Sequence, residues 1–101
     1  MSYSIAYQSR ALKEYEEAAA WYNERSIQAA ENFDSAIKEK IDILRKDPTR
    51  YRKTYKVFRE VQLHKYPFNI IYLVDEAKQL VVISSIFHHK RNPKGKYRNL
   101  K

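Results

Sequence analysis

Cationic side chains at the ends of strand-like segments are the residues of this sequence best placed to bind an anion. Lys90 and Arg91 directly follow an apolar segment, and Arg59 lies on the apolar face of an alternating one. Tyr97 lies among further cations, where its ring could stack on a nucleic-acid base or dock into the core. We predict that these four residues contact an anionic target or an acidic partner, and that Arg91 is exposed with little effect on stability. The simpler alternative is an ion pair for Arg59 and ordinary solvation for Lys90 and Arg91.

A histidine pair, His88 and His89, is the other candidate for chemistry. If a strand continues through them, their side chains point to opposite sides, which makes them poor joint ligands of a metal. No cysteine and no nearby carboxylate cluster would complete such a site, so we predict neither a metal nor a cofactor. The single glycine, Gly95, cannot form a phosphate-binding loop, and Ser84 and Ser85 have no adjacent base to activate them as nucleophiles.

The positive charge of the chain is concentrated in two blocks. The formal net charge is +8, and by segment it is −3 for residues 1–44, +6 for 45–65, −1 for 66–87 and +6 for 88–101. The basic blocks flank the most apolar part of the sequence and could converge on one face, which would attract a polyanion or an acidic protein. The alternative is a solvated surface with a frayed C-terminal tail. Charge alone does not separate RNA, DNA and acidic protein as partners.

Length and composition predict one domain. The chain has 101 residues, of which 44% are hydrophobic, enough for a single core and too few for two. Residues 1–101 therefore form one predicted domain, in which residues 92–101 are a basic tail that can be flexible. The absence of cysteine and the short apolar runs exclude a disulfide framework and a bilayer span, so we expect a cytoplasmic protein with no membrane partner.

The N-terminal half predicts a strand followed by a helical hairpin. Residues 3–7 alternate in polarity, and Ser9 is predicted to cap a helix over residues 10–24. The polar side of this helix is predicted to carry Lys13, Glu14, Glu16 and Glu17. Ser26 is predicted to cap a second helix, which ends before Pro48 because a proline disfavours helical geometry in the residue that precedes it. A connection of about two residues implies that the two helices are antiparallel.

The C-terminal half predicts three strands, over residues 57–64, 68–74 and 80–87. Residues 49–56 are predicted to be an exposed basic loop, and residues 92–95 have the preferences of a type I turn. The predicted fold class is therefore α+β: an N-terminal strand, an antiparallel helical hairpin, and a three-stranded antiparallel meander that forms one small sheet, in the order β-α-α-β-β-β.

The order of these elements and two local strings resemble a known family. Residues 63–72 read LHKYPFNIIY, and after an apolar strand residues 88–93 read HHKRNP. This arrangement is similar to the FPY.I.Y and H..R.P pattern of the RelE/ParE superfamily of toxins from bacterial type II toxin–antitoxin systems, and the resemblance covers nearly the whole chain. It implies a toxin of the plasmid-stabilisation type, neutralised by a cognate antitoxin with an acidic or amphipathic C-terminal segment. Operator DNA would be bound only through the antitoxin.

The superfamily has two kinds of target. RelE-like members cleave messenger RNA in the ribosomal A site without a metal, while ParE-like members inhibit DNA gyrase by binding and have no known nuclease activity. RelE-like nucleases resemble one another in an arginine where this chain has Asn69, and RelE itself has lysines where this chain has Glu60 and Gln62. Asparagine cannot supply a cationic guanidinium, so one phosphate contact is missing. The ParE-like branch is therefore favoured.

The nuclease alternative requires a base, an acid and a cation. Other nucleases of the family use a glutamate base with a histidine acid, which here would be Glu60 with His88 or His89. Lys90 or Arg91, together with Tyr97, could stand near the family's C-terminal arginine and tyrosine. Three hypotheses thus remain open: a ParE-like gyrase inhibitor without enzymatic activity, an mRNA endonuclease, and a degenerate member that binds only antitoxin or operator DNA as a corepressor.

Overall fold

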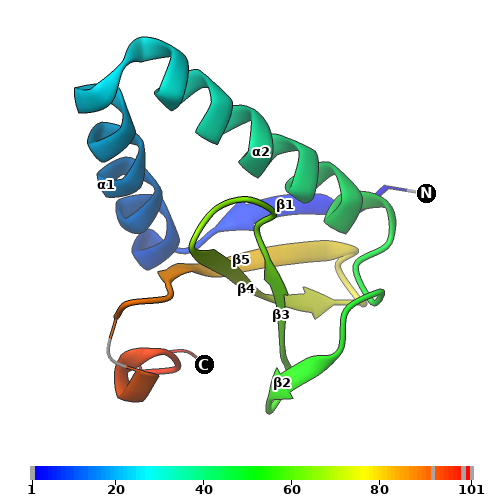
Figure 1. Cartoon of the computed structure of the whole chain (residues 1–101). Helices are drawn as coiled ribbons and strands as arrows, with labels where there is room; N and C mark the ends of the chain where they lie inside the picture. The colour runs from blue at the N-terminus through cyan, green and yellow to red at the C-terminus, as the bar shows by residue number, and fades with distance from the viewer. Residues whose placement is uncertain (1, 92, 99, 101) are drawn as a thin grey trace.

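Two helices lie on one side of a five-stranded sheet, and the C-terminal segment lies on the other side (Figure 1). The computed structural model describes residues 2–91, 93–98 and 100. Its elements are β1 (Ser4–Tyr7), α1 (Ser9–Arg25), α2 (Ile27–Lys46), β2 (Lys53–Tyr55), β3 (Phe58–Gln62), β4 (Phe68–Asp75), β5 (Leu80–His88) and a 3₁₀ turn at Pro93–Gly95. Within the described residues, no helix combines the length and the apolar character that a bilayer crossing needs.

The sheet has the strand order β1-β5-β4-β3-β2. The predicted α+β class and the helical hairpin are confirmed, but the predicted three-stranded sheet is too small. β1 joins the sheet by pairing parallel to β5, whereas the other neighbours are antiparallel. β2 lies inside residues 49–56, where a loop is predicted. All three of its residues are exposed, so this edge strand lacks the polar–apolar alternation that reveals a half-buried strand.

The start of α1 differs from the prediction, and the start of α2 agrees with it. The Ser26 hydroxyl accepts a hydrogen bond from the backbone N–H of Ala29 at 2.9 Å, which confirms the predicted cap of α2. Ser9, the predicted cap of α1, is already a helical residue, and Gln8 precedes the helix without a side-chain cap. The cause is tertiary: the Gln8 N–H donates to the carbonyl of Ile83 at 2.9 Å, so sheet pairing continues to the residue before the helix.

The main core lies between the helices and the sheet, and an aromatic cluster fills its centre. Phe33 on α2 is fully buried. Its ring lies 4.9 to 5.9 Å, between centroids, from the rings of Tyr15, Tyr22, Tyr66 and Phe68. Trp21 is different, because it is 50% exposed and carries the Arg25 guanidinium over its ring. The two helix tyrosines therefore pack as core residues, while Trp21 remains on the surface.

A bulge in β5 changes which of its side chains reach this core. Ile71 is paired with Ser85 and Tyr72 with Ile83, which leaves Ser84 as the extra residue. Before the bulge, Val81 and Ile83 belong to the helix-side core; after it, the helix-side residue is Ile86. The shift lets Phe87 join Phe58 and Ile71 in a second, smaller core on the opposite face, covered by Leu73, Tyr97 and Leu100.

Where β5 extends beyond the end of β1, a side chain instead of a strand forms hydrogen bonds with its open edge. β1 ends at Tyr7, which is paired with Ile83, but β5 continues to His88. Glu14 on α1 lies beside this open edge, and its Oε1 accepts from the Ile86 backbone N–H at 3.0 Å and from the Ser85 hydroxyl at 2.7 Å. The Glu14 side chain is only 4% exposed. A helix carboxylate thus supplies the acceptors that a neighbouring strand would supply.

Replacing Glu14 by glutamine tests this link. The Glu14→Gln change keeps the shape and one acceptor oxygen but removes the charge that Arg91 and Arg10 contact. Hydrogen bonds to charged groups contribute about 1.5–3 kcal/mol, so we expect the free energy of unfolding in urea to fall by that amount. Glu17→Gln is the control: Glu17 is exposed and 3.7 Å from Arg91, so its loss should cost about 0.5 kcal/mol or less. Equal costs for the two variants would contradict the structural role of Glu14.

The buried hydroxyl of Tyr72 leads us to predict a loss of stability at alkaline pH. The Tyr72 hydroxyl is fully buried and donates to the Pro48 carbonyl at 2.7 Å, and burial raises the pKa of this phenol to about 12. Because the pKa of tyrosine in the unfolded chain is 10.0, the raised pKa means that the Tyr72 phenol stabilises the fold. This stabilisation is complete below pH 10 and is lost as pH rises through about 12. Tyr72→Phe should cost about 1 kcal/mol near neutral pH. The deficit should shrink across this alkaline range in urea titrations; a constant deficit would contradict the role of the phenol.

Candidate functional site

Glu60 is the centre of a polar cluster on the sheet face opposite the helices. We call it the sheet-face cluster; its members are Thr54, Glu60, Asn69, His89, Lys96 and Tyr97. The Glu60 Oε1 accepts from the Tyr97 hydroxyl at 2.6 Å and from the Thr54 hydroxyl at 3.2 Å. The Glu60 Oε2 accepts from the Asn69 amide at 2.5 Å and forms an ion pair with Lys96. The cluster thus joins β2, β3, β4 and the C-terminal segment.

The electrostatics of this cluster stabilise the ionised form of Glu60. Burial by itself raises the pKa of Glu60, but the hydrogen bonds from Lys96, Tyr97 and Asn69 outweigh it and lower the pKa below its ordinary value. Burial and the hydrogen bond to Glu60 raise the pKa of Tyr97. A carboxylate with a lowered pKa and both oxygens occupied is a weak proton acceptor. Glu60 is therefore placed as an acceptor of fixed hydrogen bonds.

The two histidines lie on opposite sides of the sheet, as predicted. The His89 Nε2 is 2.8 Å from the Asn69 Oδ1, which connects it to the sheet-face cluster. The His88 ring packs edge-on against Phe68 with centroids 4.9 Å apart, and its Nδ1 accepts from the Lys90 backbone N–H at 3.0 Å. Burial, with the neighbouring positive charges, lowers the pKa of His88. Of the predicted candidates, Glu60, His89 and Tyr97 are brought together and His88 is not.

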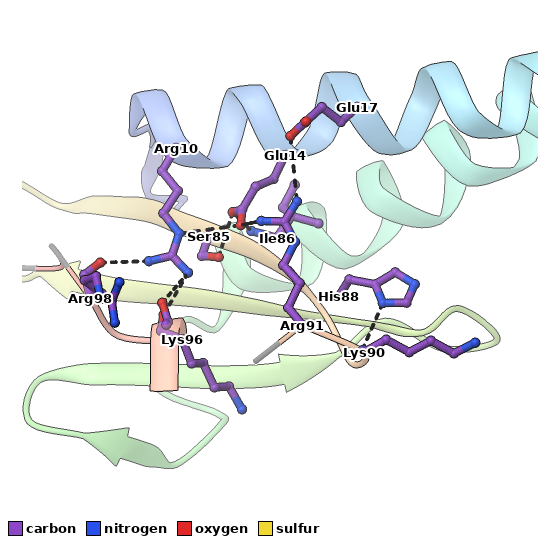
Figure 2. Close-up of polar contacts among 11 residues, drawn as sticks. Arg10, Glu14, Glu17, Ser85, Ile86, His88, Lys90, Arg91, Lys96 and Arg98 are labelled. Carbon is purple, nitrogen blue, oxygen red and sulfur yellow. Dashed lines mark hydrogen bonds and ion pairs between the residues drawn. The ribbon is translucent and has the colours of Figure 1, made fainter. Parts of the chain in front are cut away.

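Arg91 belongs to a different group, the edge cluster of Arg10, Glu14, Ser85 and Arg91 (Figure 2). The Arg91 guanidinium donates to the Glu14 Oε2 at 2.8 Å, and the Arg10 Nε lies 3.5 Å from the same oxygen. Arg91 is exposed, as predicted, but this ion pair argues against the prediction that it has little effect on stability. Although the side chain is 47% exposed, it compensates a carboxylate that is almost completely buried.

Arg10 fastens the C-terminal segment to the body of the domain. Its guanidinium donates to three backbone carbonyls, those of Gly95 at 3.2 Å, Lys96 at 2.9 Å and Arg98 at 2.9 Å. These contacts hold Lys96 and Tyr97 against the sheet-face cluster. The segment over residues 92–101 therefore packs on the domain in its described part, residues 93–98 and 100; Asn92, the first residue of the predicted type I turn, lies outside the described residues.

The remaining predicted cations, Arg59 and Lys90, are in unlike environments. The Arg59 Nη1 donates to the backbone carbonyl of Tyr51 at 2.7 Å, with that of Thr49 at 3.4 Å, so this side chain fixes the segment before β2. The alternative of an ion pair for Arg59 finds no support among the described residues, since its partners are carbonyls. Lys90 is exposed. Lys90 is thus the predicted cation that is exposed and forms no ion pair with a described residue.

Lys90 lies at one end of a groove between α1 and the ends of β4 and β5. The groove has a volume of about 360 Å³. Its apolar lining is Ala18, Trp21, Tyr22, Pro67 and Phe68, and its polar lining is Glu14, Glu17, His88, Lys90 and Arg91. Figure 2 shows His88, Lys90 and Arg91 at the end of β5, below α1. An apolar slot beside exposed cations suits an amphipathic segment with acidic residues.

Sequence reasoning missed three residues that organise these clusters: Arg10, Glu14 and Lys96. The prediction that Glu14 lies on the polar side of α1 is wrong: its spacing of three from Ala11 and four from Ala18 places it on the buried side. Arg10 and Lys96 carry no such signal, since the carbonyls that Arg10 contacts and the carboxylate that Lys96 contacts lie more than 30 positions away in the sequence. Within the described residues, no group of three or more potential metal ligands comes together.

Solved structures with the same fold are toxins and their complexes. A chain of the chromosomal ParDE toxin–antitoxin system from P. aeruginosa is 15% identical, with a TM-score of 0.73, and the match covers 86% of this chain and 96% of that one. A chain of the E. coli RelBE complex is 18% identical with a TM-score of 0.65, and the match covers 89% of this chain and 100% of that one. A chain of the RelBE2 complex from Mycobacterium tuberculosis is 12% identical with a TM-score of 0.64, and the match covers 87% of this chain and 99% of that one. At these identities the likeness is one of fold.

The sequence itself matches a family model. No curated protein matches the chain. The model of the ParE toxin of the type II toxin–antitoxin system parDE matches residues 5–93, which include both helices, β2 to β5, all of β1 except Ser4, and the residues Glu60, Lys90 and Arg91. The chain therefore belongs to the ParE toxin family of type II toxin–antitoxin systems.

Proposed function

We propose that this type II toxin inhibits DNA gyrase by binding to it in the cytoplasm, without enzymatic activity. The observation that carries the proposal is the engagement of Glu60, whose two carboxylate oxygens accept four hydrogen bonds or ion-pair contacts from the protein itself. A group in this state has neither the free lone pair nor the basicity that proton abstraction requires. The chain's membership in the ParE toxin family points to the same branch.

The other groups that RNA cleavage needs are also committed to contacts within the protein. Arg91 is paired with Glu14, and the raised pKa of Tyr97 accompanies its hydrogen bond to Glu60. Asn69 replaces the arginine of the RelE-like nucleases, so that cation is missing. RNA cleavage is the second candidate because Glu60, Asn69 and His89 form one connected chain of hydrogen bonds. Release of Tyr97 and Lys96 from Glu60 would be its first requirement.

The cognate antitoxin is the expected partner of the groove beside α1. Its apolar slot, next to the half-exposed Trp21, would take apolar side chains of an amphipathic segment. Lys90 and the exposed part of Arg91 would pair with acidic residues of the same segment. Trp21 and Arg91 fit the usual composition of energetically dominant contacts. The gyrase contact would use the same cationic end, so antitoxin and target would compete for Lys90.

A paired assay separates the two proposed activities. After induction of the protein alone in cells, we expect plasmid supercoiling to fall while messenger RNA remains intact at ribosomal A sites. Glu60→Gln should then leave the loss of supercoiling in place when the variant is expressed at the same level, because Glu60 has no chemical role. A-site cleavage that disappears in Glu60→Gln would contradict gyrase inhibition and establish the nuclease. Normal growth with folded, abundant protein would favour the degenerate form that only binds antitoxin or operator DNA.

Charge reversal at Lys90 tests the groove. Lys90→Glu should weaken antitoxin binding by about tenfold or more, because an attractive contact becomes a repulsive one. The measurement is titration calorimetry with the antitoxin encoded beside the toxin gene. Lys13→Glu is the matched control, since Lys13 is an exposed lysine on α1 outside this groove. An unchanged affinity for Lys90→Glu, with normal thermal stability, would place the antitoxin elsewhere.

A further inference from the structure

We propose that residues 50–56, which we call the basic edge, bind the backbone of a single-stranded nucleic acid. The segment reads RYRKTYK and contains four cations and two tyrosines in seven residues. It includes β2, the outermost strand of the sheet. The inference goes beyond the proposed function and holds for a gyrase inhibitor, a nuclease or a degenerate member alike.

The cations of the basic edge are available to a ligand. Arg50, Arg52, Lys53 and Lys56 are all exposed, and none of them forms an ion pair with a described residue. The carboxylate that contacts the segment by a side-chain hydrogen bond is that of Glu60, which accepts from Thr54 at 3.2 Å. Its charge is already balanced by Lys96. Four like charges along an extended segment repel one another, and a polyanion relieves this repulsion.

Tyr55 gives the basic edge an exposed aromatic ring, whereas Tyr51 packs against the main core. The Tyr55 ring stacks on the Tyr97 ring, with centroids 4.4 Å apart and an interplanar angle of 18°, yet Tyr55 remains 38% exposed. The Lys56 ammonium lies 5.3 Å from the Tyr55 ring centroid. Single-strand binding proteins combine cations that follow the backbone with aromatic rings on which bases stack. A supported ring beside a lysine has both features.

The C-terminal segment brings the second basic block to the same surface. Tyr97 contacts Tyr55 through its ring, and its hydroxyl lies 2.9 Å from the Thr54 hydroxyl. Lys96 lies 5.8 Å from the Tyr97 ring centroid. The two blocks that each carry a net charge of +6 therefore meet at β2. Because the Lys96 charge is balanced by Glu60, the C-terminal segment contributes the Tyr97 ring that supports Tyr55, and the exposed cations of the first block supply the attraction for a polyanion.

Nucleic acid fits this surface better than an acidic protein does. Carboxylates need only the cations, whereas unstacked bases also use the exposed tyrosine faces. A duplex keeps its bases stacked inside and leaves the Tyr55 ring without a partner. We therefore assign a single strand to the basic edge and treat duplex DNA and acidic polypeptide as competing outcomes of the test.

The experiment measures binding of a labelled single-stranded DNA of about 16 nucleotides to the full-length protein by fluorescence anisotropy. The test variant is Arg52→Gln with Lys53→Gln, and the control is Lys13→Gln with Lys78→Gln, which changes the net charge equally at two exposed lysines elsewhere. At about 50 mM salt we expect the test variant to bind about tenfold more weakly. Its slope of log K against log salt should be shallower by about 1.4, because two phosphate contacts are lost.

Several results would overturn the proposal. Equal weakening by the test and control variants would show that only net charge matters. Tighter binding of the matching duplex, or stronger competition by polyglutamate than by unlabelled oligonucleotide at equal charge, would assign the surface to those ligands. No binding at about 50 mM salt would mean that the cations serve only to keep the edge strand from pairing with other chains. Unfolding temperatures of both variants close to that of the parent protein would exclude misfolding as the cause.

Discussion

The carboxylate of Glu14 is the contact on which the arrangement of this domain depends. A charge that is almost completely removed from water must be compensated by nearby donors. Here the donors come from three parts of the chain: Arg10 on α1, Ser85 and Ile86 on β5, and Arg91 after β5. One side chain therefore fixes α1 against the sheet edge that β1 leaves open. Because Arg10 shares this carboxylate, it also sets where the C-terminal segment can attach.

A second buried carboxylate repeats the arrangement on the other face. Glu60 is compensated by Lys96 and Tyr97, which Arg10 places over the sheet through its bonds to the backbone of the same segment. The C-terminal segment thus covers the small core of Phe58, Ile71 and Phe87 and supplies its polar contacts. Each of the two buried carboxylates thus has a cationic partner from beyond β5: Arg91 for Glu14 and Lys96 for Glu60.

Much of this fold is predictable from local patterns, and the exceptions have definite causes. The helices and the three long strands follow from periodicity, and Ser26 from its capping chemistry. β2 is not predicted, because all three residues of this edge strand are exposed and it therefore lacks the alternation of polar and apolar residues. The Ser9 prediction fails because sheet pairing by Gln8 is a tertiary contact. Of the site residues, Glu60, His89 and Tyr97 are found by type, but the contacts of Glu60 with Asn69 and Lys96, which lower its pKa, depend on pairing between distant segments.

The contacts divide the cations of the chain into two groups: those that pair with buried carboxylates and those that do not. Arg10, Arg91 and Lys96 are counterions of buried carboxylates, so their charge is balanced inside the domain. The cations around β2 and Lys90 have no such partner among the described residues. Since a balanced charge contributes little to the field outside the protein, attraction of anionic partners falls mainly to the second group. The cations before β3 and Lys90 are thus the ones open to ligands, while Arg91 and Lys96 of the block after β5 hold the domain together.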